Sequence, residues 1–146
     1  MRIYLDNCSY NRPFDDQTQI KICLETSAKL YIQNEIRNGV YELVWSFMND
    51  IENNDNPYDD RRGAIQKWKS IAKYYCKTSE EILERGKTIE KLKIKPKDSL
   101  NIACAIVSNC NYFITTDIKL LNKNIDRIKI VNPMDFIIEM EKKDED

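Results

Sequence analysis

Residues 3–7 read IYLDN, a short apolar run that stops at an acidic residue, and residues 112–117 read YFITTD and stop in the same way. Short runs of β-branched and aromatic residues that end in polar residues are typical of buried strands. We therefore expect a strand in each. Two more runs of this kind, VYELVWS at residues 40–46 and IKIV at residues 128–131, predict further strands.

The segments between these runs have the apolar spacing of amphipathic helices. Gly39 is expected to end the first helix, and Pro96 to begin one that is apolar on nearly all sides and therefore buried. Thr78 and Glu81 have the spacing of a capping box. Strands that alternate with helices predict a helix-rich α/β sandwich around a central parallel sheet. The predicted helices cover residues 16–38, 47–53, 58–76, 78–92, 96–107 and 134–140.

Composition indicates one globular domain. The chain has 146 residues, 42% apolar and 32% charged, and a formal net charge of -1, so no bulk positive charge attracts nucleic acid. Its five cysteines contain no CxxC pair, which favours reduced thiols. The sequence shows no signal peptide and no run of about 20 apolar residues. We expect a cytoplasmic protein without a membrane partner.

Two residue types are nearly or entirely missing. The absence of histidine excludes Ser-His-Asp and Cys-His catalysis and HExxH zinc sites. The three glycines are isolated, so neither a dinucleotide-binding turn nor a Walker loop is present, and we expect no nucleotide cofactor. Proton transfer at neutral pH would therefore fall to carboxylates or to metal-bound water.

Four carboxylates are expected to converge. Asp6 and Asp117 follow strands, Glu52 lies just beyond the strand that ends at Ser46, and Asp98 lies in the first turn of the buried helix. Sites in parallel sheets form at the carboxyl ends of the strands. Converging carboxylates repel one another unless a cation joins them, and Mg²⁺ or Mn²⁺ suits oxygen ligands. Such a site suits phosphodiester hydrolysis by metal-activated water.

Each acid also has a purely structural interpretation. Asp6 can end its strand with an Asx-turn, Asp117 can cap the short helix that follows it, Asp98 can be a first-turn helix acid and Glu52 can lie on a solvated helix face. Only the joint placement of the four favours a metal site.

The chain resembles the PIN domain family of Mg²⁺- or Mn²⁺-dependent nucleases, which includes the VapC-type toxins of bacterial toxin-antitoxin pairs. The resemblance implies a three-layer α/β sandwich over residues 1–140, followed by an acidic, disordered tail at residues 141–146. It also implies that Asp6, Glu52, Asp98 and Asp117 are catalytic metal ligands or metal-water ligands, and that Thr116 lines the site. The matching residues are Ile3–Asn7, Ser46 with Glu52, Lys97–Ala103 with Ala105, Thr115–Asp117, and Asn132-Pro133 with Asp135-Phe136.

The sequence departs from the family in the buried helix, where Asp98-Ser99 and Asn101 stand in place of Asp-Ala and a histidine. Asp50 competes with Glu52 for the role of the second acid. Asn7 is predicted either to bind at the substrate, orienting Asp6 or the attacking water, or merely to cap the strand end.

Basic residues provide candidates for substrate binding. Arg12 is placed to donate to a substrate phosphate. Arg61, Arg62, Lys67 and Lys69 either extend a positive track or form a solvated helix face.

Our leading hypothesis is therefore a metal-dependent endoribonuclease acting on single-stranded or structured RNA, and the toxin of a type II toxin-antitoxin pair. The family then implies a homodimer and a small antitoxin as partners. The alternative is a non-catalytic PIN-like module that binds metal or RNA or acts as a scaffold. An aspartyl phosphotransfer domain is disfavoured, because Cys8 stands where a second aspartate would be needed.

Overall fold

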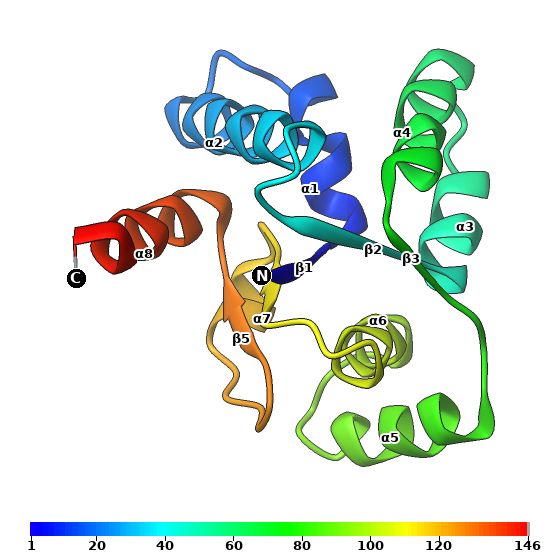
Figure 1. Cartoon of the computed structure of the whole chain (residues 1–146). Helices are drawn as coiled ribbons and strands as arrows, with labels where there is room; N and C mark the ends of the chain where they lie inside the picture. The colour runs from blue at the N-terminus through cyan, green and yellow to red at the C-terminus, as the bar shows by residue number, and fades with distance from the viewer. Residues whose placement is uncertain (146) are drawn as a thin grey trace.

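A computed structural model describes residues 1–145 of the chain. At its centre is a five-stranded sheet of order β3-β2-β1-β4-β5, in which every neighbouring pair is parallel (Figure 1). The predicted parallel α/β architecture is therefore confirmed. The strands are β1 (Arg2–Leu5), β2 (Glu42–Ser46), β3 (Tyr74–Cys76), β4 (Tyr112–Ile114) and β5 (Lys129–Val131).

Helices cover both faces of this sheet and make a three-layer sandwich (Figure 1). Helices α5 and α6 pack together on one face, and α2, α4 and α8 cover the other. The helical segments are α1 (Asn7–Asn11), the 3₁₀ helix η1 (Arg12–Phe14), α2 (Ile20–Arg37), α3 (Phe47–Asn54), α4 (Asp59–Ile71), α5 (Glu80–Glu90), α6 (Pro96–Val107), α7 (Ile118–Leu121) and α8 (Pro133–Glu145). Among residues 1–145, no helix is both long enough and apolar enough to span a membrane.

Successive side chains along a central strand belong to different hydrophobic cores. On β1, Ile3 and Leu5 belong to the core under α2 and α8, whereas Tyr4 belongs to the core under α5 and α6. This follows from the two-residue period of a strand, which directs successive side chains to opposite faces. Strands buried on both faces need continuous apolar runs, which is why Ile3–Leu5 of β1 and Tyr112–Ile114 of β4 are apolar throughout.

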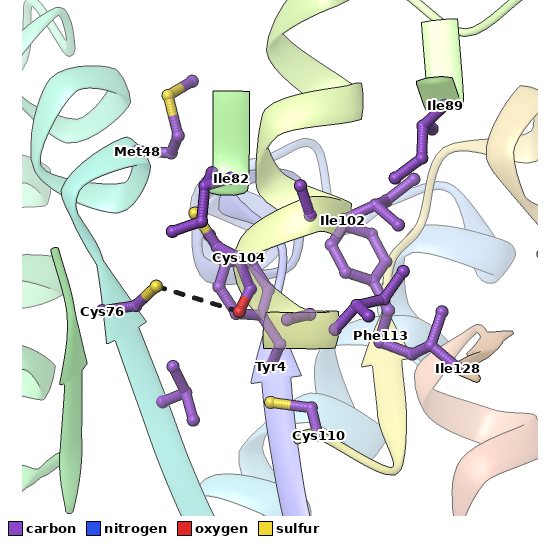
Figure 2. Close-up of a cluster of buried hydrophobic side chains, with 14 of the residues drawn as sticks. Tyr4, Met48, Cys76, Ile82, Ile89, Ile102, Cys104, Cys110, Phe113 and Ile128 are labelled. Atoms are coloured by element: carbon purple, nitrogen blue, oxygen red, sulfur yellow. Dashed lines mark hydrogen bonds between the residues drawn. The ribbon is translucent and has the colours of Figure 1, made fainter. Parts of the chain in front are cut away.

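The core under α5 and α6 packs α6 against the centre of the sheet (Figure 2). The rings of Tyr4 and Phe113 stack with their centroids 5.3 Å apart, and Cys76 Sγ donates to the Cys104 carbonyl at 3.9 Å. A Cβ at Gly86 of α5 would lie 3.0 Å from the Leu100 side chain, so this glycine allows α5 to approach α6 closely. Helix α6, which begins with Asp98 in its first turn, is thereby fixed against the sheet.

Several predicted boundaries were wrong. The helix expected over residues 58–76 ends at Ile71, because the backbone becomes extended at Ala72 and Tyr74–Cys76 pair with β2 as an edge strand. Ser79, not Thr78, caps α5, since its hydroxyl accepts from the Ile82 amide. Residues 7–14, for which no helix was predicted, form α1 and η1.

The closing helix is longer than predicted. Helix α8 continues past Met140 to Glu145, so residues 141–145 of the expected disordered tail are helical, and residue 146 lies outside the described part. Lys143 Nζ donates to the Tyr112 hydroxyl at 3.2 Å, which ties this last turn to β4.

Candidate functional site

The site begins where three adjacent parallel strands end. Asp6 follows β1, Ser46 ends β2 and Thr115 follows β4. Because β1 and β4 pair Leu5 with Ile114, the next residues, Asp6 and Thr115, lie side by side at the carboxyl edge of the sheet. The register of the sheet therefore positions the first acid.

An open pocket at this edge brings together the four predicted carboxylates. Asp6 comes from the end of β1, Glu52 from α3, Asp98 from the first turn of α6 and Asp117 from the turn after β4. The pocket is lined by Asp6, Asn7, Cys8, Asn11, Glu52, Asp55, Lys97, Asp98 and Asp117. It thus holds five carboxylates and one ammonium group, so its charge is strongly negative.

Asp6 is the most enclosed of these acids, with 6% of its surface exposed. Its Oδ2 accepts hydrogen bonds from the Thr115 hydroxyl at 2.8 Å and from the Cys8 thiol at 3.3 Å. Its Oδ1 accepts from the Asn7 amide at 2.8 Å, which caps α1. The carboxylate is therefore fixed in orientation by donors on both sides.

Glu52 is held by a buried polar chain that crosses the sheet edge. Asn101 Nδ2 on α6 donates to Glu52 Oε1 at 2.7 Å. The Tyr4 hydroxyl donates to Asn101 Oδ1 and lies 2.6 Å from Ser46 Oγ. Because Ser46 also caps α3, the helix that carries Glu52 and the side chain that orients Glu52 are part of one network.

Burial and mutual repulsion raise the pKa of three of these acids. Burial, followed by the charge of Asp6, raises the pKa of Glu52 to about 7, against the hydrogen bond from Asn101. Burial and the charges of Asp6 and Asp117 raise the pKa of Asp98 to about 6. Burial likewise raises the pKa of Asp6, although Thr115, Cys8 and Asn7 donate to it. Crowded carboxylates with raised pKa values are typical of a site that a bound cation would stabilise.

Asp50, the alternative to Glu52 as the second acid, does not line the acidic pocket. Its carboxylate accepts from Trp45 Nε1 at 2.8 Å and from the Tyr75 hydroxyl at 2.6 Å, and it pairs with Lys69 at 3.1 Å. These donors lower the pKa of Asp50 although its burial acts in the opposite direction. The structure therefore gives Asp50 a role in joining β2, β3 and α4, and places Glu52 with the other acids.

Asp117 and Asn7 have structural contacts within the pocket wall. Asp117 caps α7, since its Oδ1 accepts from the Lys119 amide at 2.9 Å. Asn7 lines the pocket, and its Oδ1 is buried without a hydrogen-bond partner in the described structure. The capping interpretation of Asp117 therefore coexists with its position in the acidic pocket.

Two other predicted site residues are not brought into the pocket. Thr116 is buried, and its amide donates to Cys8 Sγ, whereas the preceding residue Thr115 contacts Asp6. The guanidinium of Arg12 on η1 pairs with Glu25 at 2.9 Å and with Asp15 at 3.1 Å. A substrate phosphate would have to break these ion pairs before it could take Arg12 as a ligand.

The expected basic track on α4 is largely engaged in local contacts. Arg62 pairs with Asp59, and Lys69 pairs with Asp50. Arg61 lies over the Tyr58 ring at 4.1 Å, and Lys67 lines a pocket between α2 and α4 rather than the acidic one. These contacts are typical of a solvated helix face.

The donor chemistry of the acidic pocket fits a hard divalent cation, because carboxylates are the ligands that Mg²⁺ and Mn²⁺ prefer. However, within residues 1–145 no three acidic or thiol side chains are arranged so that together they could hold an ion. Mg²⁺ keeps several waters and needs only one or two direct carboxylates, so a partly hydrated ion fits this open arrangement.

Sequence reasoning missed several residues of the site. Asp55, at the end of α3, adds a fifth carboxylate, and Asn101 and Thr115 orient Glu52 and Asp6. The pairing of β1 with β4 could have revealed Thr115, because it places Thr115 opposite Asp6. Asp55 and Asn101 depend on where α3 and α6 cross the sheet edge, and no local pattern encodes this.

Comparison with known proteins gives a likeness of fold only. No protein-family model matches the chain, and no curated protein matches it. A chain in the crystal structure of VapBC2 from Rickettsia felis, bound to a DNA fragment from their promoter, aligns with a TM-score of 0.59 and 14% identity over 90% of this chain and 98% of that one. A chain in the structure of VapBC-1 from nontypeable Haemophilus influenzae aligns with a TM-score of 0.51 and 19% identity, over 92% and 99% respectively. The chain has a PIN-like three-layer α/β fold.

Proposed function

We propose that this protein is a metal-dependent endoribonuclease that hydrolyses RNA phosphodiester bonds. The observation that carries the proposal is the convergence of Asp6, Glu52, Asp98 and Asp117, from four separate elements, in one pocket at the carboxyl edge of the sheet. The likeness in fold to chains of two VapBC complexes agrees with the sequence resemblance to the PIN domain family of nucleases.

Asp6 and Asp98 would hold Mg²⁺ or Mn²⁺ directly, and Asp117 and Glu52 would act as partners of metal-bound water. A divalent cation in such a site supplies charge neutralisation and an activated water for attack on phosphorus. Asp6 is preorganised for this role, because Thr115 and the Asn7 amide fix both of its oxygens. Preorganised polar groups do not have to reorganise during the reaction.

Glu52 contributes through its orientation. The bond from Asn101 occupies Oε1 and leaves Oε2 available to a water or a substrate group at the pocket. Asn7, whose side-chain oxygen lacks a protein partner, is a second group that can orient substrate or water there. We retain Arg12 and Thr116 only as residues near the site whose contribution requires a rearrangement of their present contacts.

The proposal extends to partners. The two complexes are named as VapBC pairs, and one of them is bound to promoter DNA. We propose by analogy that this chain is the toxin of a cytoplasmic toxin-antitoxin pair, acts as a homodimer and is neutralised by a small antitoxin protein that covers the acidic pocket.

A non-catalytic module is the second candidate. It is favoured by the absence, within the described residues, of three side chains arranged to hold one ion. Such a module would bind metal or RNA at the acidic pocket without turnover.

Cleavage of a mixed pool of single-stranded RNA distinguishes the two. Purified protein is incubated with Mn²⁺ or Mg²⁺, with EDTA as one control and a folded Asp98→Asn variant as the other. The nuclease predicts cleavage that both controls abolish. Metal binding that depends on Asp98, without cleavage of any RNA, would support the non-catalytic module instead.

A further inference from the structure

A second pocket adjoins the acidic one and shares two of its residues. It is lined by Lys93, Lys95, Lys119 and Lys123, together with Asp98 and Asp117, and we call it the lysine pocket. The buried side chains of Ile94 and Leu120 anchor its two walls, which are the turn before α6 and the short helix α7.

The four lysines are free of ion pairs. Every ion pair found among residues 1–145 involves a lysine or arginine other than these four. Lys97, at the rim of the acidic pocket, is likewise unpaired. By contrast, Arg62 and Lys69 on α4 are paired with Asp59 and Asp50. Five basic side chains that form no ion pair within residues 1–145 therefore lie beside the acids.

Lys93 has a backbone conformation that is unusual for a lysine. Its φ is 64°, in the left-handed region, and Ile94 next to it is buried. Glycine or asparagine is the comfortable residue at such a position, and lysine is disfavoured there. The charge of Lys93 can therefore be removed without strain by a change to glycine.

The arrangement suits a polyanion that passes both pockets. Phosphates carry the charge of an RNA strand, and lysines bind them as point charges without reading the base. A strand with one phosphate at Asp98 and Asp117 would place the neighbouring phosphates beside the lysines. Ile94 and Leu120 are 5% and 2% exposed, so neither apolar side chain is available for contact with a ligand.

We propose that the lysine pocket binds the backbone phosphates of single-stranded RNA next to the phosphate that lies at the acidic pocket. The inference rests on the proposed function for the identity of the substrate. It replaces the α4 face as the expected basic track. It assigns no base specificity to these lysines, because point charges distinguish phosphates from neutral groups and not one base from another.

The test is RNA binding measured in EDTA, so that turnover does not enter. A fluorescent single-stranded RNA is titrated with wild-type protein, with Lys119→Gln/Lys123→Gln, with Lys93→Gly, and with Arg61→Gln/Lys67→Gln as the matched control on α4. For single strands, each lost phosphate contact makes the slope of log K against log salt less steep by about 0.7. The pocket double variant is therefore expected to lose about 1.4 from the slope and about tenfold in affinity near 0.15 M salt.

Lys93→Gly is expected to weaken binding by roughly threefold by the same relation, while its thermal stability is unchanged or higher. The α4 control should bind as the wild type does. Unchanged affinity and slope in the pocket variants, no binding by the wild type either in EDTA or with Mn²⁺, or loss confined to the α4 control would each overturn the proposal. Binding of poly-glutamate that matches RNA and needs the same lysines would assign the pocket to an acidic protein partner instead.

Failure of this inference is separable from failure of the proposed nuclease activity. If cleavage occurs with the same KM in wild type and in Lys119→Gln/Lys123→Gln, the nuclease stands and the lysine pocket is not its substrate track. If RNA binds through the lysines but is never cut, the binding site stands and the nuclease does not.

Discussion

Asn101 Nδ2 donates a 2.7 Å hydrogen bond to Glu52 Oε1, joining α6 to α3 across the carboxyl edge of the sheet. The two residues are 49 positions apart, and the bond exists only because α6 packs under β1. Asn101 is fully buried and also accepts from the Tyr4 hydroxyl. It is a positioning residue for Glu52.

Asn101→Ala is expected to lower kcat at least tenfold with a smaller change in KM, because Glu52 loses its fixed orientation. It should also cost about 1–3 kcal/mol of stability, since a buried polar network loses a member. Tyr4→Phe is the control, because it perturbs the same network but leaves the bond between Asn101 and Glu52. Equal losses of activity in the two variants, in proportion to their stability, would show that Asn101 is merely structural.

Glu52 and Asp50 should have opposite phenotypes. Glu52→Gln is expected to reduce cleavage at least a hundredfold with little change in folding, because Glu52 lines the acidic pocket. Asp50→Asn should retain cleavage but lose about 1–2 kcal/mol of stability, because Trp45, Tyr75 and Lys69 all contact that carboxylate. RNA cleavage rates and urea unfolding of both variants check this, and the reverse pattern would make Asp50 the second acid.

The metal-free protein should lose stability as the acids ionise. Since the folded pKa of Glu52 is about 7 and that of Asp98 about 6, the folded state binds more protons than the unfolded state between about pH 4 and pH 7. Their contribution to stability is therefore present at low pH and is lost as pH rises through the folded pKa values. The Asp98→Asn substitution should remove the part of this pH-dependent loss of stability that the ionisation of Asp98 causes.

Because Asp98 is half-exposed and screened by solvent, we expect a gain near 1 kcal/mol, or about 2–4 °C in Tm, at pH 7.5 in EDTA. At pH 4.5 the gain should vanish. Mn²⁺ should raise the Tm of the wild type and have a smaller effect on Asp98→Asn. Calorimetry at both pH values tests this, and a variant that is less stable than wild type at pH 7.5 in EDTA would contradict it.

Lys29 on α2 provides an independent pH dependence. It is 4% exposed, its ammonium lies 5.5 Å from the centre of the Tyr10 ring, and no carboxylate of the described residues pairs with it. Burial and the nearby charge of Arg37 lower the pKa of Lys29 to about 7. The unfolded state therefore binds one more proton than the folded state between about pH 7 and pH 10, and stability contributed by this group rises with pH.

Lys29→Met is the matched variant for this effect. It should be more stable than the wild type at pH 6.5, by up to about 4 kcal/mol, and the difference should shrink as the pH approaches 10. The difference in unfolding free energy between the two proteins at each pH is the quantity to measure. A constant difference across this range would show that Lys29 is charged in the folded protein.

The central strands and the acids that follow them could be predicted from the sequence because both depend on local pattern. Asp6 and Asp117 follow short apolar runs, and parallel pairing then brings the ends of these runs to one edge. The position of Asp98 was predictable because Pro96 begins a helix that is apolar on nearly all sides, and Asp98 lies in the first turn of that helix. The role of each acid in catalysis stays a prediction.

The edge strand β3 was missed because the apolar residues around it continue the helical spacing of α4. Ile71, Ala72 and Tyr75 continue the apolar stripe of α4, yet Tyr74–Cys76 pair with β2 because the sheet provides an open edge there. Such pairing is a tertiary effect that no window of sequence contains. Arg12 was expected to bind the substrate because it lies close to Asp6 in the sequence. Its ion pair with Glu25 on α2 is likewise a tertiary contact that the local sequence does not show.

The lysines beside the acids were missed because they come from two separate segments. Lys93 and Lys95 belong to the run KLKIKPK at residues 91–97, which leads into α6, whereas Lys119 lies in α7 and Lys123 follows it. The folded chain places both pairs on one pocket. Two of the basic residues on α4, Arg62 and Lys69, are neutralised by Asp59 and Asp50.

The most direct test of the central claim is the rate of RNA cleavage by one preparation of the protein after its divalent ions are removed and then restored. Our account predicts no cleavage after chelation, full recovery on addition of Mn²⁺ or Mg²⁺, and no recovery in Asp98→Asn or Glu52→Gln. Cleavage that persists in the chelated protein, or that Mn²⁺ restores equally in Asp98→Asn, would contradict a nuclease built on these four acids.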